Sequence, residues 1–316
     1  MRVALAGDTM LGRGVADVLE LSAPSSLVEP ALAELMREAD VTVLNLECCV
    51  SDRGAPVRLA EKPFFFRAPP RAVELLAHLG VDGVTLANNH ALDFGDVALF
   101  DTFEHLDGAG IGWVGAGWDL TRARAPLRLP AGEETLTVVG FTDHPAAFAA
   151  GADRPGVAYV DLRSGLDPWV GAVISGVERG CVLVSPHWGP NMTTQPLPPV
   201  RAAAGQLLAA GASLVAGHSA HVFHGVDGAV LYDLGDFLDD YRVDPVLRND
   251  LGLLFLVDID VGGPRRLEVV PLKLEYCWTG LATGEDRQWI SRRFRSACLA
   301  FHQEVTEADG RLVLTW

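Results

Sequence analysis

Short runs of apolar residues alternate along the chain with longer segments whose apolar positions recur at a helical period. Such runs predict buried strands, and the segments between them predict helices. The predicted strands span residues 3–6, 41–46, 83–87, 112–115, 125–129, 136–141, 181–185, 214–216, 229–232, 251–261 and 265–274. The predicted helices span residues 28–39, 70–79, 96–110, 166–178, 200–210 and 286–304. This alternation is typical of an α/β fold, and the strand-rich stretch near 229–276 adds antiparallel partners.

The pattern is interrupted neither by a low-complexity linker nor by a repeat of fixed period. We therefore expect one compact domain over residues 1–280, with residues 281–316 as a helix and tail packed on it. The 316 residues are 49% hydrophobic and 21% charged, which is the composition of an ordinary globular protein with an ample core.

Acidic residues exceed basic ones by 41 to 25, which gives a net charge of −16 with histidine neutral. Nucleic-acid-binding proteins need a basic footprint, so this balance argues against a nucleic-acid partner. The sequence shows neither a signal peptide nor an apolar stretch of the roughly 18 residues that a membrane anchor needs. Its five cysteines include no CxxC pair, so a disulfide framework is not indicated. These features predict a cytoplasmic protein without a membrane anchor.

Polar residues that can bind metals follow the predicted strands at their carboxyl ends. Asp8, Glu47, Asn89, His187 and His218 each stand directly or almost directly after an apolar run. Ligands of α/β sheets bind outside the carboxyl ends of strands, so we expect these side chains to converge on one crevice. Oxygen and imidazole ligands suit divalent Mn, Fe or Zn. The set is too large for one structural zinc, and it predicts two ions that activate water for hydrolysis.

Each of these residues also has a structural interpretation. Asp8, in Gly-Asp-Thr, could cap a helix or form an Asx turn. His187 could be a core histidine, and His218 and His221 could be turn residues. Glu47 is harder to explain in this way, because an unpaired glutamate is seldom buried. Since coincidental placement of so many polar residues at strand ends is improbable, the metal-site interpretation is favoured.

Six motifs carry these residues: GDTMLGR (7–13), NLE (45–47), LANNHALDFG (86–95), PHWG (186–189), GHSAHV (217–222) and YDLGDF (232–237). In this order they resemble the motifs of the CapA-type poly-γ-glutamate capsule-biosynthesis family, which belongs to the calcineurin-like metallophosphoesterases. The resemblance covers about residues 1–275. It implies a four-layer αββα sandwich, in which two mixed sheets pack face to face with helices outside.

The resemblance also implies a set of metal ligands, with Glu47 in the place of the carboxylate that bridges the two ions. The ligands that it implies are Asp8, Glu47, Asn89, His187, His218 and His221.

Five further residues are predicted to act on the substrate. The resemblance assigns His90 to contact the substrate or to protonate the leaving group. His90 also directly follows a predicted ligand, a suitable place for a general acid, and Asp93 is the candidate for orienting it. Arg13, Arg67 and Asn88 are predicted to contact an anionic small-molecule or polymeric substrate. For both arginines a surface salt bridge is the alternative.

The sequence departs from the family pattern at four points. Asp8-Thr9-Met10 stands where the superfamily has Asp-x-His, so the first metal site is expected to be short of a ligand. Pro190-Asn191 follows HWG where the family commonly has a glutamate. YDLGDF replaces a YSLGNF-like motif and adds Asp233 and Asp236, which either serve as extra ligands or strengthen a turn. The membrane anchor frequent in capsule-associated members is missing, which weakens any inference of capsule building.

Three functions are compatible with these residues. The first is a two-metal hydrolase of phosphoesters, in which metal-activated hydroxide attacks the substrate. The second uses the same site to cleave or handle an amide or γ-glutamyl bond, as in poly-γ-glutamate. The third is a non-catalytic scaffold that binds an anionic polymer or partner. The intact ligand set argues against the third, because buried carboxylates and imidazoles at one crevice are costly without a task.

Overall fold

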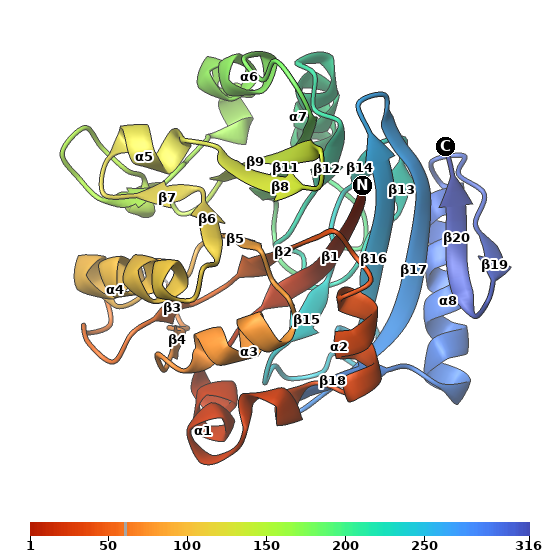
Figure 1. The fold of residues 1–316 in the computed structure, drawn as a ribbon, viewed down its shortest axis with the longest axis horizontal. Coiled ribbons are helices and arrows are strands. Elements are labelled where there is room, and N and C mark those ends of the chain that lie inside the picture. The colour runs from red at the N-terminus through yellow and green to blue at the C-terminus, as the bar shows by residue number, and fades with distance from the viewer. Residues whose placement is uncertain (60–61) are drawn as a thin grey trace.

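The computed structural model describes residues 1–59 and 62–316, which form an α/β fold around two facing sheets (Figure 1). The larger sheet contains β1 (Arg2–Thr9), β2 (Val41–Leu46), β5 (Gly83–Thr85), β6 (Gly112–Val114), β15 (Asp236–Leu238), β16 (Leu251–Asp260), β17 (Gly263–Glu275), β18 (Trp278–Leu281), β19 (Thr306–Ala308) and β20 (Arg311–Thr315). The smaller sheet contains β8 (Leu127–Ala131), β9 (Glu134–Thr142), β11 (Cys181–His187), β12 (Leu214–Ala216), β13 (Val226–Asp227) and β14 (Val230–Leu231).

Both sheets are mixed. The larger runs in the order β19-β20-β17-β16-β1-β2-β5-β6, with β15 beside β1 and β18 beside β17. Within it β1 is parallel to β2 and β15 but antiparallel to β16. The smaller runs β13-β14-β12-β11-β9-β8, with a parallel centre and antiparallel edges. Two short strand pairs, β3 (Cys49–Val50) with β4 (Arg67–Ala68) and β7 (Ala116–Gly117) with β10 (Gly156–Val157), complete the strands of the described residues.

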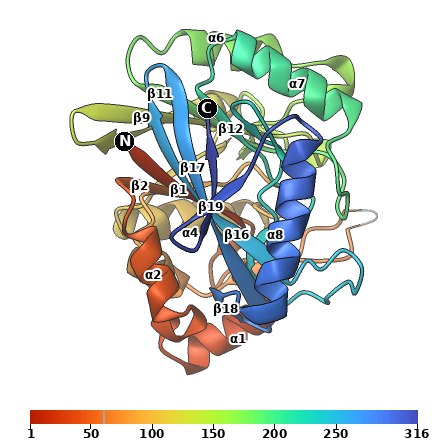
Figure 2. The ribbon, with the colours of Figure 1, turned by 90° about the vertical axis from the view of Figure 1, so that its right-hand side faces the viewer.

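Helices cover the outer faces of the two sheets. They are α1 (Arg13–Leu21), α2 (Pro30–Met36), α3 (Ala72–His78), α4 (Gly95–Gly108), α5 (Leu120–Arg124), α6 (Pro168–Ser175) and α7 (Pro198–Ala209), whereas α8 (Gly284–Leu299) packs its buried residues between the sheets. In Figure 1, α6 and α7 lie at the top over the smaller sheet, while α1 to α3 lie at the bottom, under the larger one. Figure 2 shows α8 along the side of the molecule, and its Ile290 and Phe294 pack with residues of both sheets.

Three apolar clusters lie between these layers, because successive residues of a strand point to opposite faces. Val3 and Leu5 of β1 pack with Val138 and Leu183 of the smaller sheet in the cluster between the sheets. The alternate residues of β1 belong to a second cluster, shared with α1 to α4. A third cluster lies between the smaller sheet and α5 to α7. The order helix, sheet, sheet, helix confirms the predicted αββα sandwich.

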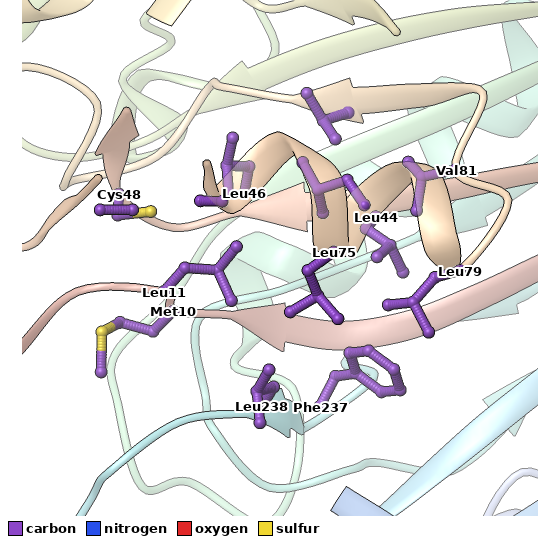
Figure 3. Close-up of a cluster of buried hydrophobic side chains, with 14 of the residues drawn as sticks. Met10, Leu11, Leu44, Leu46, Cys48, Leu75, Leu79, Val81, Phe237 and Leu238 are labelled. Carbon is purple, nitrogen blue, oxygen red and sulfur yellow. The ribbon is translucent and has the colours of Figure 1, made fainter. Parts of the chain in front are cut away.

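The outer cluster of the larger sheet holds the strand ends that lead to the polar crevice. Figure 3 shows Leu46 of β2 and Met10, just beyond β1, within it, together with Leu75 of α3. Both Met10 and Leu46 are fully buried. Burial of one such side chain stabilises the fold by about 1.5–3 kcal/mol, so the backbone beside Asp8 and Glu47 is firmly held.

The sequence pattern does not predict α1 or the β19–β20 hairpin. Gly12 precedes α1 and offers no side-chain cap, so the usual start signal of a helix is missing. β20 is short and exists through its antiparallel pairing with β17, a contact distant in the sequence. The predicted helices at 28–39 and 286–304 are shorter in the structure, where they end at Met36 and Leu299. The predicted pair of strands at 125–129 and 136–141 is confirmed as the β8–β9 hairpin.

Across the described residues, helices that combine the length and the apolar character needed to span a bilayer are absent.

Candidate metal centre

The carboxyl ends of strands from both sheets meet at one buried crevice. Asp8 is the penultimate residue of β1, Glu47 follows β2, His187 ends β11 and His218 follows β12. All four residues are 3% exposed or less. The two sheets are joined here, because His218 Nδ1 lies 2.9 Å from Asp8 Oδ1. The structure therefore brings these predicted ligands together.

Glycine precedes Asp8 and His218 because the backbone is crowded at both positions. A Cβ atom at Gly7 would lie 2.1 Å from the backbone oxygen of Gly235, and one at Gly217 would lie 2.2 Å from that of Tyr232. No larger residue fits at this distance, so the Gly-Asp and Gly-His pairs of the sequence are required by close strand packing.

Two groups of possible ligand atoms share Asp8. In the first, Asp8, His221 and Asp236 offer atoms that all lie within 4.8 Å of one another. His221 Nδ1 is 2.8 Å from Asp236 Oδ1 and 3.3 Å from Asp8 Oδ2. In the second, Asp8, Glu47 and His187 meet the same criterion, and His187 Nε2 is 3.5 Å from Glu47 Oε1. Two adjacent ions with a shared carboxylate fit this arrangement.

Several buried atoms of the crevice have no hydrogen-bond partner among the described residues. They are both oxygens of Glu47, both ring nitrogens of His187, Asn89 Oδ1 and Asp236 Oδ2. Buried polar atoms without partners cost free energy, and natural proteins contain few of them. Every atom in this set is a good ligand for a divalent cation. The residues present therefore fit a metal centre.

Burial and mutual repulsion perturb the pKa values of these groups. Burial, reinforced by the charge of Asp8, raises the pKa of Glu47 well above its usual range. Burial likewise raises the pKa of Asp236 to about 6 and lowers that of His187. Although burial opposes it, the hydrogen bond with His218 lowers the pKa of Asp8. Bound cations would favour the deprotonated form of all these ligands.

His90 belongs to a separate, well-paired cluster beside the crevice. Its Nδ1 donates to Asp93 Oδ2 at 2.6 Å, which leaves Nε2 directed toward Glu47 Oε1 at 4.0 Å. Asp93 also accepts from the backbone nitrogen of Phe66 at 2.7 Å and pairs with Lys62 Nζ at 2.8 Å. The His90 ring stacks on Phe66 with centroids 3.9 Å apart. Burial lowers the pKa of His90 to about 4, so the imidazole of the free protein is neutral at pH 7.

Asn88, Arg13 and Arg67, the predicted substrate contacts, differ in burial and in the groups that they bind. Asn88 is buried beneath the crevice, where its Nδ2 donates to Asn45 Oδ1 and Leu46 O and its Oδ1 accepts from His90 N. Its amide therefore braces the strand ends and the loop that carries His90. Arg13 is in the left-handed region, with φ of 51°, and pairs with Asp240.

The Arg13 pair lies at a cavity of about 390 Å³ that is also lined by His90 and His221. Arg67 donates to the backbone oxygens of Arg53 and Gly54, and its guanidinium stacks on Phe94 at 4.3 Å. Arg67 thus contacts the protein backbone and Phe94, whereas Arg13 lines a cavity that a substrate can enter.

Sequence reasoning missed Lys62 and Tyr241. Lys62 is 10% exposed at its side chain and also donates to the backbone oxygen of Asn89 at 2.7 Å. Tyr241 packs edge-on against His221 at 5.2 Å, and its buried hydroxyl has no partner among the described residues. Burial and the charge of Glu47 raise the pKa of Tyr241, which keeps this hydroxyl a hydrogen-bond donor. Both residues lie outside the predicted strands. The only sequence signals near them are the aromatic run at 64–66, after Lys62, and the acidic pair at 239–240, before Tyr241.

Comparison with known proteins gives a family match, relatives of similar sequence and a distant structural neighbour. Residues 2–241 match the family described as bacterial capsule synthesis protein PGA_cap. A probable polyglutamine synthesis accessory protein of Mycobacterium tuberculosis is 33% identical over 352 aligned positions, which cover 92% of this chain and 91% of that protein. The capsule biosynthesis protein CapA of Bacillus anthracis is 26% identical and aligns with 87% of this chain and 68% of its own length. A solved 5'-nucleotidase precursor from Thermus thermophilus is 14% identical, covers 95% of this chain and 58% of its own, and has a TM-score of 0.44.

Proposed function

The chain belongs to the bacterial capsule synthesis protein family, and from this premise we propose that it is a two-metal-dependent hydrolase of phosphoesters. The family membership and the αββα fold give a hydrolase-type scaffold for divalent metals. The observation that carries the proposal is the set of buried, unpartnered ligand atoms of Glu47, His187 and Asn89 around Asp8. Two carboxylates and several imidazoles around one crevice are the donor set of a two-ion site.

The ligands in this proposal lie at or after the carboxyl ends of β1, β2, β5, β11 and β12. They are Asp8, Glu47, Asn89, His187, His218 and His221. The ions would be divalent Mn, Fe or Zn, and when bound they would activate a water molecule and neutralise substrate oxygens. The remaining contributions come from the side chains around them.

His90 contacts the leaving group in this proposal. Its Nδ1 is fixed by Asp93, so the ring presents Nε2 to the crevice, next to Glu47. A neutral Nε2 accepts a hydrogen bond, and a negative substrate beside it raises its pKa and allows it to hold a proton for the departing oxygen. Asp93 acts through His90 and is a positioning residue.

The cavity of about 390 Å³ beside His90 and His221 receives the rest of the substrate. Its aromatic and cationic wall includes Arg13 and Tyr241. Because Arg13 is already paired with Asp240, it supplies directed hydrogen-bond donors without a large net charge. The hydroxyl of Tyr241 is the donor next to the ligands and would contact a phosphoryl oxygen.

A second function uses the same residues on an amide or γ-glutamyl bond. The observation that favours it is the naming of two relatives, for polyglutamine synthesis and for capsule biosynthesis. Divalent ions held by these ligands would supply an activated water, and such a water would attack a carbonyl as well as a phosphoryl centre. The net charge of −16 speaks against tight binding of a long polyanion by the protein surface alone, which disfavours the scaffold function.

The test is hydrolysis by chelator-treated protein that is reloaded with Mn²⁺, Fe²⁺ or Zn²⁺ under anaerobic conditions. Bis-p-nitrophenyl phosphate, p-nitrophenyl phosphate and a γ-glutamyl p-nitroanilide are the probes. We expect metal-dependent release of nitrophenolate from a phosphoester and its loss in the Glu47→Gln variant. Cleavage of the anilide alone would favour the second function. Tight ion binding without cleavage of any probe would contradict hydrolysis of these ester and amide classes.

A further inference from the structure

Asp236 is a buried carboxylate that the predicted ligand set leaves out. It begins β15 and lies directly beside Asp8 in the parallel pairing of β15 with β1. It is 1% exposed. Its Oδ1 accepts from His221 Nδ1 at 2.8 Å, whereas its Oδ2 has no hydrogen-bond partner in the described part of the chain. The side-chain amide of Asn249 lowers the pKa of this carboxyl group, against the larger effect of burial. Asn249 Nδ2 donates to the backbone oxygen of Arg242 at 3.4 Å.

The two residues that follow Asp8 are engaged elsewhere and add no ligand beside it. Met10 is turned into the outer apolar cluster (Figure 3), where its sulfur accepts from Gly12 N at 3.1 Å. The hydroxyl of Thr9 donates to the backbone oxygen of Gly7 at 3.3 Å. Asp8, His221 and the bridging Glu47 would then be the protein ligands of one ion, and a divalent ion can accept a further ligand beside them.

We propose that Asp236 is a further protein ligand of this ion, beside Asp8 and His221. This inference rests on the proposed metal centre and adds a residue to it. The ligand atoms of the three residues lie within 4.8 Å of one another, so one cation can reach all of them. The two carboxylates balance the charge of a divalent ion, and the cation gives the unpartnered Oδ2 of Asp236 the partner that it lacks.

The neighbouring Asp233 has a different task in the same YDLGDF motif. It is also buried, but its carboxylate accepts from Ala220 N at 2.8 Å and from Gly235 N at 2.9 Å. These bonds tie the loop that carries His221 to the start of β15. Asp233 thus positions the loop while Asp236 binds the ion, and the pair offers a matched comparison within one motif.

A rival explanation is that Asp236 only orients His221 by accepting from its Nδ1. Asparagine distinguishes the two roles, because it retains an acceptor oxygen for His221 and loses the charge. An orienting residue would tolerate Asp236→Asn with little change in ion binding. A ligand would not.

The experiment counts Mn²⁺ ions bound per chain, by electron paramagnetic resonance of free Mn²⁺ and by metal analysis after equilibrium dialysis. We expect two ions in the wild type and two in Asp233→Asn, whose melting temperature falls. In Asp236→Asn we expect the affinity for one of the two ions to fall at least about 10-fold, by comparison with losses seen even for residues behind a ligand. Full binding of both ions by Asp236→Asn would overturn the inference and leave the proposed function intact.

A second measurement uses the wild type, so it does not depend on how the variant folds. Anomalous scattering from crystals soaked in Mn²⁺ locates the ions directly. We expect a peak bonded to Asp236 Oδ2, Asp8 and a nitrogen of His221. An ion bound by Asp8 and His221 without Asp236 would refute this ligand set alone. Absence of any ion, in crystals and in solution, would refute the proposed metal centre as well.

Discussion

Two buried polar clusters adjoin in this crevice, and they differ in how their charges are compensated. In the braced cluster, formed by Lys62, His90 and Asp93, the carboxylate has a lysine, an imidazole and a backbone N–H as partners. In the open cluster, formed by Asp8, Glu47, His187 and Asp236, several ligand atoms have no partner among the described residues. The clusters approach to 4.0 Å between His90 Nε2 and Glu47 Oε1.

This difference separates the tasks of the two clusters. The braced cluster holds its geometry with protein groups alone, so it can position His90 whether or not cations are bound. The open cluster places like charges and desolvated imidazoles together, which is costly until a cation joins them. Variants of the open cluster should therefore lose metal, whereas variants of the braced cluster should keep it.

The largest effect is expected for Glu47→Gln, which removes one negative charge from the open cluster at constant size. We expect activity to be abolished and the affinity for both ions to fall at least about 10-fold, because a bridging carboxylate neutralises two centres. Metal analysis and phosphodiester hydrolysis measure the two effects. Full metal content together with full turnover in this variant would show that Glu47 does not bridge.

Next in size are His187→Ala, which removes an imidazole of the open cluster, and His218→Ala, which removes the hydrogen-bond partner of Asp8. We expect each variant to lose metal, and activity with it, while circular dichroism stays near that of the wild type. His78→Ala, on α3, is the control and should keep its ions. A His187 variant that unfolds yet binds the normal number of ions would favour a structural role for this residue.

His90→Asn changes the braced cluster and should spare the ions. We expect the rate to fall by about 10² to 10⁴, the usual loss when an acid–base group is removed. The loss should be smallest for nitrophenyl substrates, whose leaving group departs without a proton. Asn89→Ala, one residue away, should lower metal occupancy as well as rate. Metal loss in both variants, or an equal rate loss with good and poor leaving groups, would contradict this role for His90.

Lys62→Met tests the other side of the braced cluster and should have a smaller effect on the rate. The positive charge of Lys62 lowers the pKa of His90, in addition to the larger effect of burial. Its removal should raise that pKa and move the alkaline limb of the pH–rate profile, where His90 loses its proton, to higher pH, with metal content unchanged. Since one partner of a buried ion pair is lost, the free energy of unfolding should fall by about 3 kcal/mol. An unchanged pH–rate profile would show that Lys62 does not act on His90.

The smallest effect concerns pH in the unmodified protein. Burial raises the pKa of Asp236 to about 6 in the folded, metal-free chain, above its value in the unfolded chain. Its contribution to stability is therefore present at low pH and is lost as the pH rises through about 6, unless a cation takes the place of the proton. We expect added Mn²⁺ to raise the melting temperature more at pH 8 than at pH 5. An equal rise at both values would mean that the ions displace no protons.

Local sequence rules predicted the backbone of this site well and its side-chain partners poorly. The strand ends at Asp8 and His218 could be found because a glycine and an apolar run mark each of them. The sandwich followed from the alternation of elements and from the family resemblance. By contrast, Asp236 reaches the crevice through β15, a three-residue strand that pairs with a strand far away in the sequence. Its role as a possible ligand therefore stayed undecided at the level of sequence.

The predicted substrate contacts also show that sequence rules do not identify side-chain partners. Asn88 stands beside two predicted site residues, yet its amide is used by Asn45, Leu46 and His90. Hydrogen-bond partners of this kind come from tertiary packing, which residue type and spacing do not encode.

The central claim is that the open cluster is a site for two divalent cations, and a titration of the metal-free wild type tests it most directly. Calorimetry and metal analysis at pH 7.5 would count the Mn²⁺ ions bound per chain and record the melting temperature at each step. The account predicts two ions per chain and, for each site, a stabilisation of about 2.7 kcal/mol once free Mn²⁺ reaches roughly 100 times its dissociation constant. A chain that binds no ion and melts at the same temperature with and without Mn²⁺ would contradict it.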